Sequence, residues 1–107
     1  MGTVYGRLNQ TAKAFEAHQE AVRLAPDNAV AWFNLGVDYG DQGRRAEAIQ
    51  AYEQALRLNP NYADAWNNLG VAYAVTGRRS ELADIYGRLK RLDPTLAERF
   101  FNKVLMP

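Results

Sequence analysis

The sequence repeats itself with a fixed period. The stretch AWFNLGVDYGDQGRR at residues 31–45 returns as AWNNLGVAYAVTGRR at residues 65–79, 34 positions later. The same interval separates Pro26, Pro60 and Pro94, so the units are whole and a shortened copy precedes the other two. Periods of roughly 20 to 50 residues are typical of solenoids, whose units bury apolar surface only against neighbouring units. The repeat therefore predicts one array of stacked units.

Each unit has the pattern of two antiparallel helices. Trp32, Leu35 and Tyr39 have the i, i+3, i+7 spacing of an amphipathic helix, and the alanines and larger apolar residues after position 45 form the stripe of a second helix. Between the two, Gly43 and its counterpart Gly77 suit a short turn, because glycine adopts positive φ without steric cost. We therefore predict an all-α fold, a solenoid of stacked antiparallel helical hairpins.

Two glycines lie inside the predicted helices rather than between them. At Gly36 and Gly70, glycine costs a helix about 1 kcal/mol relative to alanine. We expect a packing reason for both, namely the close approach of a second helix.

The recurring residues form a family pattern. The first complete unit reads W-x-x-L-G-x-x-Y, then alanine, an aromatic residue, alanine and proline, at Trp32, Leu35, Gly36, Tyr39, Ala48, Tyr52, Ala55 and Pro60. This pattern resembles the tetratricopeptide repeat (TPR), although the next unit has Leu82 and Leu89 in place of two alanines. The resemblance implies a right-handed superhelix. Its concave wall, built by the first helix of each hairpin, commonly holds an extended peptide or a helix of a partner.

The sequence predicts a single TPR array in four parts. These are a truncated repeat at 1–28, repeats at 29–62 and 63–96, and a C-terminal packing helix at 97–107. The truncated repeat lacks the first half of its leading helix, and Met1 stands where a leucine is expected. Either the chain is a fragment of a longer array, or its open ends pair with another copy. Both interpretations stay open.

The helix expected over residues 95–106 carries more apolar residues than one packed face can cover. If the face with Phe100 packs on the last hairpin, Phe101 and Leu105 are poorly covered. Phe100, Phe101 and Leu105 are therefore the candidate residues for self-association, in which this helix enters the open N-terminal end of another copy.

Asparagines recur at one position of the repeat. Asn34, Asn68 and Asn102 each follow the tryptophan position by two residues, about 200° around a helix, so they face away from the hairpin core. Asparagine is a mediocre helix former, but its amide both donates and accepts hydrogen bonds, which gripping a peptide backbone requires. The arrangement resembles the asparagine ladder in the repeats of O-linked N-acetylglucosamine transferase, which holds extended polypeptide. The alternative is that these amides bond only neighbouring helices or water.

Neighbours of these asparagines complete a candidate peptide-binding surface. They are Phe33, Val37 and Asp41 in one unit and Asp64, Asn67 and Val71 in the next. The two valines either touch the ligand or pack on the adjacent helix. In chaperone-binding TPR proteins a clamp of lysine and arginine grips a C-terminal carboxylate, and here Asp64 and Asn68 stand where that clamp has basic residues. We therefore expect no recognition of a free C-terminal carboxylate.

Composition narrows the function further. The 13 basic and 12 acidic residues form no basic stripe for nucleic acid, and no apolar run is long enough for membrane insertion. The chain has no cysteine, and its single histidine, His18, has no second histidine with which to share a metal, so we expect His18 to be a packed core residue. We expect no cofactor, metal or catalytic residue. The location is unknown, and the lack of a signal or transmembrane segment weakly favours the cytoplasm.

Two hypotheses for the function remain. The first is a non-catalytic protein-protein interaction module, a scaffold or adaptor that binds an extended peptide or a helix of a partner on its concave face. The second is a self-assembling unit that forms homo-oligomers through its open N-terminal end and its C-terminal helix. The amide-bearing face favours the first and the unfinished ends favour the second.

Overall fold

The computed structural model describes the backbone of residues 2–105 and the side chains of residues 10–105. The elements are α1 (Gly2–Leu24), α2 (Ala29–Asp41), α3 (Arg45–Leu58), α4 (Ala63–Val75), the 3-10 turn η1 (Arg79–Glu81), α5 (Leu82–Leu92), α6 (Pro94–Phe100) and the π-helical turn η2 (Phe101–Leu105). No strand occurs among the described residues, and the predicted all-α fold is confirmed.

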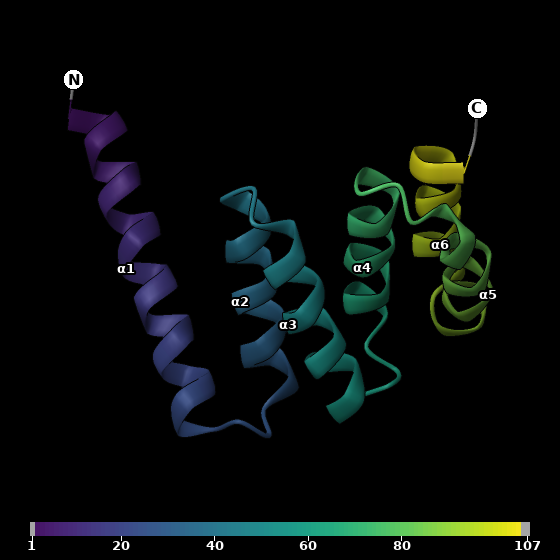
Figure 1. Cartoon of the computed structure of the whole chain (residues 1–107), viewed down its shortest axis with the longest axis horizontal. Coiled ribbons are helices and arrows are strands. Elements are labelled where there is room, and N and C mark those ends of the chain that lie inside the picture. The colour runs from purple at the N-terminus through teal and green to yellow at the C-terminus, as the bar shows by residue number, and fades with distance from the viewer. Residues whose placement is uncertain (1, 106–107) are drawn as a thin grey trace.

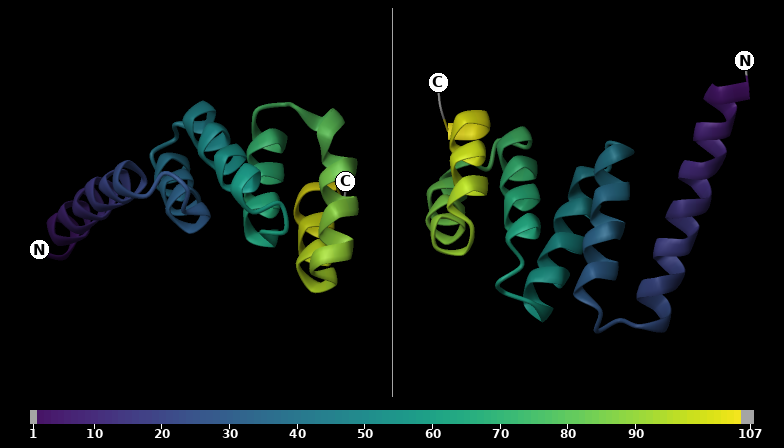
Figure 2. Two further views of the ribbon diagram at one scale, coloured as in Figure 1. Left: turned by 90° about the horizontal axis from the view of Figure 1, so that it is seen from below. Right: turned by 180° about the vertical axis from the view of Figure 1, so that it is seen from behind.

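The helices lie side by side in chain order. Figure 1 shows α1 at one end of the row and α5 and α6 at the other, and Figure 2 shows the same order from two further directions. Each helix packs chiefly against its neighbours in the chain, and the contact between α2 and α3 is the most extensive. The fold is therefore the predicted solenoid, with a core that runs along the row.

Both hairpin turns end the preceding helix in the same way. Gly43 and Gly77 have φ of +76° and +83°, the left-handed conformation that glycine adopts without strain. In each turn the N–H of the next residue bonds back to the helix, from Arg44 to the Tyr39 carbonyl at 2.8 Å and from Arg78 to the Tyr73 carbonyl at 2.7 Å. The turns predicted at these glycines are confirmed.

The interior glycines permit close packing, as expected, but against different partners. A Cβ on Gly36 would lie 2.6 Å from Cε1 of Tyr52, the aromatic residue of the same hairpin. A Cβ on Gly70 would lie 2.4 Å from Cε2 of Phe100, which belongs to α6. Tyr86, the counterpart of Tyr52, is only half-buried and instead packs against Phe101, with ring centroids 5.3 Å apart and the rings tilted by 42°. The second hairpin therefore repeats the sequence pattern of the first without repeating its packing.

Loops between the hairpins are held by tryptophans. The Trp32 indole Nε1 donates to the Pro26 carbonyl at 2.8 Å, and the Trp66 Nε1 donates to the Pro60 carbonyl at 2.7 Å. Each bond joins the first turn of a helix to the loop that precedes it. Side-chain caps begin two helices, with Asn28 at α2 and Asp93 at α6.

The first helix runs straight through the place where the other units turn. Asn9 stands 34 positions before Gly43, and α1 continues without a break from Gly2 to Leu24. Asparagine adopts the left-handed conformation that ends a helix less readily than glycine does, whereas each further helical residue adds a hydrogen bond. The N-terminal part of α1 therefore extends beyond α2 instead of folding back (Figures 1 and 2). The prediction for Met1 lies outside the described residues.

The C-terminal helix packs on the last hairpin by one face. α6 and η2 are continuous from Pro94 to Leu105, close to the expected range, and Met106 lies outside the described residues. Phe100 is 1% exposed and Val104 is buried, whereas Phe101 is 37% exposed. Within residues 2–105 no helix is both long and apolar enough to cross a membrane.

Candidate functional site

A pocket of about 190 Å³ opens between the first hairpin and α4, and we call it the amide pocket. Its polar lining comes from Arg45 and Tyr52 of α3, Asn67 and Asn68 of α4, and Lys103 of η2. Its apolar lining includes Val71 and Val75, on the same side of α4 as the two asparagines. Val75 is 56% exposed, so the apolar part of the pocket is open to a ligand.

The amides and the hydroxyl in this pocket form a short chain of hydrogen bonds. Asn67 Nδ2 donates to Asn68 Oδ1 at 3.1 Å, and Asn68 Nδ2 donates to the Tyr52 hydroxyl at 3.5 Å. Because Tyr52 accepts this bond, its own hydrogen is left to donate, and the remaining amide positions of Asn67 are left to donate and accept. The chain therefore offers both kinds of partner that a peptide backbone needs.

Tyr52 is held as a hydroxyl rather than a phenolate. Burial raises the pKa of Tyr52 above its ordinary value, the hydrogen bond from Asn68 lowers it, and the charges of Asp41 and Asp38 raise it further. The ring packs beside Phe33 with centroids 5.9 Å apart, which fixes the direction in which the hydroxyl points. Tyr52 is thus a hydrogen-bond donor at neutral pH.

The pocket is basic at its rim. Arg45 and Lys103 line it, and no carboxylate does. Within the part of the chain that the structure describes, neither side chain makes an ion pair or a hydrogen bond. Both charges are therefore available to an acidic group on a ligand.

The structure brings three of the predicted peptide-binding residues together, namely Asn67, Asn68 and Val71. The others lie elsewhere. Asp41 and Asp64 are exposed at the end of α2 and the start of α4, and Asn102 is exposed on η2. Asn34 is half-buried on α2, and Phe33 and Val37 pack against the core, with the Phe33 ring 4.9 Å from that of Tyr62.

Sequence reasoning missed Tyr52, Arg45 and Lys103 as parts of the site. Tyr52 was assigned only to the hairpin core, but its ring passes beside Gly36 and its hydroxyl reaches the pocket. The choice of tyrosine over phenylalanine was the available signal, since a buried hydroxyl needs a partner. No signal pointed to the two cations, because they come from separate elements.

The preceding unit has a histidine, His18, at the position of Tyr52. His18 stands 34 positions before Tyr52, and its Nδ1 pairs with Asp38 Oδ2 rather than with Asn34. The expectation that His18 is a packed core residue is therefore wrong, since 32% of its side chain is exposed. The imidazole pairs with Asp38 of α2, and the equivalent position in the next unit is Ala72, which has no carboxylate. No group of three or more metal-ligating side chains occurs in the described part of the chain.

Of the three candidate self-association residues, one is buried within its own chain and two are accessible to another copy. Phe100 is buried within its own chain beside Gly70, so it is not available to another copy. Phe101 is exposed and Leu105 is half-buried, so these two remain accessible.

Comparison with known proteins identifies the type of repeat. Residues 38–77 match the family model of the TPR repeat. No curated protein sequence matches the chain.

Three solved structures share the fold. YrrB, described as a TPR protein with an unusual peptide-binding site, is 29% identical with a TM-score of 0.75, over 92% of this chain and 52% of that one. MamA is 24% identical with a TM-score of 0.75, over 97% and 72% of the two chains. The second TPR domain of human RPAP3, in complex with the HSP70 peptide SGPTIEEVD, is 20% identical with a TM-score of 0.81, over 99% and 90%. The chain thus spans about half the length of YrrB. The chain therefore has the fold of these TPR structures, a solenoid of helical hairpins, and its residues 38–77 match the TPR repeat model.

Proposed function

We propose that the chain is a non-catalytic protein-interaction module, and that its amide pocket binds an extended segment of a partner protein. The observation that carries the proposal is the hydrogen-bonded series Asn67, Asn68 and Tyr52, set beside the exposed Val75. Side-chain amides recognise a peptide backbone without requiring a particular sequence, because every residue of a peptide presents one donor and one acceptor.

The rest of the pocket restricts which segment is favoured. Val71 and Val75 give an apolar side chain a place to lie, and Arg45 and Lys103 favour an acidic residue near it. The peptide-binding description of YrrB, at 29% identity, supports the same class of ligand for this chain. Of the three asparagines that resemble the ladder of O-linked N-acetylglucosamine transferase, Asn68 is the one that lines the amide pocket. In this proposal it is therefore the one that contacts the peptide.

The first test concerns Asn68. Peptides selected by display on the immobilised chain are measured by calorimetry against the chain and its Asn68→Ala variant. The Asn68 amide keeps a second N–H and a second lone pair beyond its bonds to Asn67 and Tyr52, so it too can bond a ligand. We expect the variant to bind the peptides about fivefold more weakly, a loss of about 1 kcal/mol of binding free energy, because that hydrogen bond is lost. Equal affinities for the two proteins would refute the amide pocket as the binding site.

Asn34→Ala is the matched comparison for that test. Asn34 occupies the same repeat position but does not line the pocket. Unchanged binding by Asn34→Ala indicates a single local site. A loss equal to that of Asn68→Ala indicates a ladder that continues along α2.

Self-assembly is the second candidate function, and one observation favours it. Ala14 of α1 is exposed, whereas its counterpart Ala48, one repeat later, is 1% exposed beneath α2. Together with the exposed Phe101 at the other end, α1 offers a helix face that a second copy can cover.

A further inference from the structure

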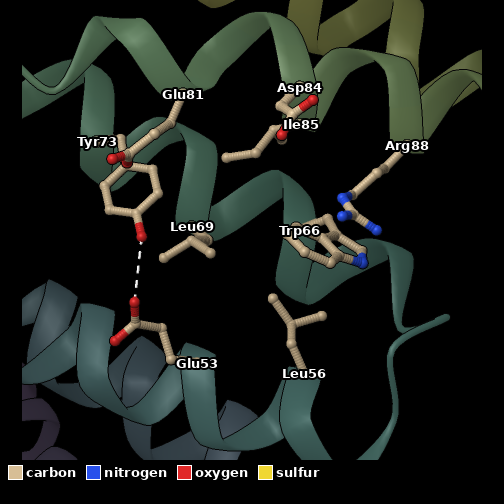
Figure 3. A pocket seen from close by; sticks show the side chains of 9 residues that line it. All are labelled: Glu53, Leu56, Trp66, Leu69, Tyr73, Glu81, Asp84, Ile85 and Arg88. Carbon is tan, nitrogen blue, oxygen red and sulfur yellow. Dashed lines mark hydrogen bonds between the residues drawn. The ribbon is translucent and has the colours of Figure 1, made fainter.

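A second pocket, of about 260 Å³, lies on the other side of α4 from the amide pocket, between α3, α4 and the start of α5 (Figure 3). We call it the acidic pocket, because Glu53, Glu81 and Asp84 line it. It shares no lining residue with the amide pocket, since α4 presents Trp66, Leu69 and Tyr73 here and its asparagines there. Nothing in the proposed function uses it.

The negative charge gathers at one end of this pocket. Figure 3 shows Glu53 and Glu81 at the end formed by Tyr73, whose hydroxyl donates to Glu53 Oε2 at 3.2 Å. Glu81 Oε1 accepts from Arg78 Nη2 at 3.2 Å, while Glu81 Oε2 is enclosed and has no hydrogen-bond partner. Because 42% of the Glu81 side chain is exposed, a small rotation of its carboxylate brings this unpaired oxygen to a donor on a ligand.

The middle of the pocket is apolar and its far end is aromatic. Leu69 lies between Tyr73 and Trp66 in Figure 3, with Leu56 and Ile85 on either side. The only cation in the lining is Arg88, whose guanidinium carbon lies 4.7 Å from the centre of the Trp66 ring. Arg88 thus stands at the end away from Glu53 and Glu81, and the lining has three carboxylates against one cation.

We propose that the acidic pocket is a second binding site, which takes a lysine or arginine side chain of a partner protein. The charged head lies between Glu53 and Glu81 against the Tyr73 ring, and the carbon stem crosses Leu69. Long basic side chains suit this layout, because their stems pack on apolar surface while their heads reach acceptors. Arg78 already lies over the Tyr73 ring, 4.2 Å from its centre, so the attraction for the charged head comes from the carboxylates of Glu53 and Glu81.

The preceding hairpin offers an internal comparison. Its equivalent opening is lined by Trp32 and Tyr39, and Glu47 stands at the position of Glu81 and pairs with Arg44 as Glu81 pairs with Arg78. Gln50, however, stands where the acidic pocket has Asp84. The lining of the first opening therefore has two carboxylates, Glu47 and Glu53, and no cation, whereas the acidic pocket has three carboxylates and Arg88. The difference between the two openings is the third carboxylate, Asp84, and not the net charge.

The test uses a small probe and the full chain labelled with ¹⁵N. N-acetyl-L-arginine methylamide is titrated while ¹H–¹⁵N correlation spectra follow the Trp66 indole N–H and the backbone amides of residues 81–85. We expect saturable shifts with a dissociation constant of about 1 mM, typical of a ligand this small. N-acetyl-L-citrulline methylamide, which has the same shape without the charge, should shift none of these signals.

Substitutions of the pocket's carboxylates test whether they hold the arginine probe. Glu81→Gln should weaken probe binding about fivefold, and Asp84→Asn, at an exposed position, should weaken it in the same direction. Glu47→Gln is the matched control and should leave the constant unchanged. The proposal is overturned if the citrulline probe binds equally well, if Glu47→Gln weakens binding as much as Glu81→Gln, or if the saturable shifts occur at Asn67 and Asn68 instead.

Discussion

Single residues decide how closely the helices of this array approach one another. Gly36 and Gly70 occupy the same repeat position, and in both cases an aromatic ring lies where a Cβ would stand. The sequence predicted a close approach at both glycines, because glycine in a helix interior needs a reason. It did not identify Phe100 as the ring beside Gly70, because Phe100 lies outside the hairpin and Tyr86 has the repeat position of Tyr52.

The contact between Gly70 and Phe100 predicts that an alanine at position 70 lowers the stability of the fold. Gly70→Ala should destabilise the fold by about 1 to 3 kcal/mol, because its Cβ would lie 2.4 Å from the buried Phe100 ring and the cost exceeds the gain in helix propensity. Urea unfolding followed by circular dichroism measures the change.

Gly87→Ala is the control for Gly70→Ala. Gly87 also lies inside a helix, but no atom would lie within 4 Å of an added Cβ. This variant should be more stable than the parent, by up to about 1 kcal/mol. If both substitutions change the stability in the same direction, close packing is not the reason for Gly70.

The second hairpin shows, at the level of elements, how a repeat pattern and its packing can differ. The one-turn η1 precedes α5, and α5 buries Leu82, Ile85 and Leu89 at the positions where α3 buries Ala48, Ala51 and Ala55. The difference is at the aromatic position, because Tyr52 of α3 is buried and Tyr86 of α5 is only half-buried. Helix order, turns and hairpin pairing were predictable because they follow from periodicity and glycine. Which aromatic ring lies beside Gly70 was not predictable, since it depends on side-chain volumes from three elements at once.

Phe100 rather than Tyr86 should therefore carry the stability of the C-terminal end. Phe100→Ala should cost about 3 to 5 kcal/mol, because it empties a buried site between α4 and α6. Tyr86→Ala should cost less than half as much, since that ring is half-buried against Phe101. Denaturant titration of both variants gives the comparison. Equal costs would mean that Tyr86, as in the repeat pattern, fills the core.

The candidate site was predictable only where it lies on one helix. Asn67, Asn68 and Val71 share a face of α4, and helical spacing alone groups them. Tyr52 and Lys103 reach the amide pocket from α3 and η2, so their proximity depends on how the elements stack. Asn34 has the right spacing but a different environment, because His18 pairs with Asp38 beside it.

At the scale of the whole molecule, the two ends of the row present different surfaces. α1 leaves Ala14 exposed at one end, and Phe101 is exposed at the other. If self-assembly is the function, size-exclusion chromatography with light scattering should give a mass that rises above 12.0 kDa with concentration. Phe101→Asp should then return the mass to 12.0 kDa, since a buried charge without a partner is costly.

Circular dichroism shows whether Phe101→Asp lowers the mass by preventing association or by unfolding the chain. Phe101→Asp should keep the helix content of the parent, because Phe101 is exposed in the single chain. A mass that stays at 12.0 kDa over a hundredfold range of concentration contradicts self-assembly. An oligomer that survives the substitution contradicts the role of Phe101.

The tryptophan hydrogen bonds also bear on how the array responds to a pull. The bonds from Trp32 to Pro26 and from Trp66 to Pro60 each tie a helix to the loop before it, and proline fixes φ within that loop. Neither loop can bend freely without breaking its bond. Phe100, at the third such position, has no N–H to make one. Under tension, the links before α2 and α4 should therefore be held by a tryptophan hydrogen bond, and the one-residue link before α6 by the Asp93 cap and the buried Phe100 ring.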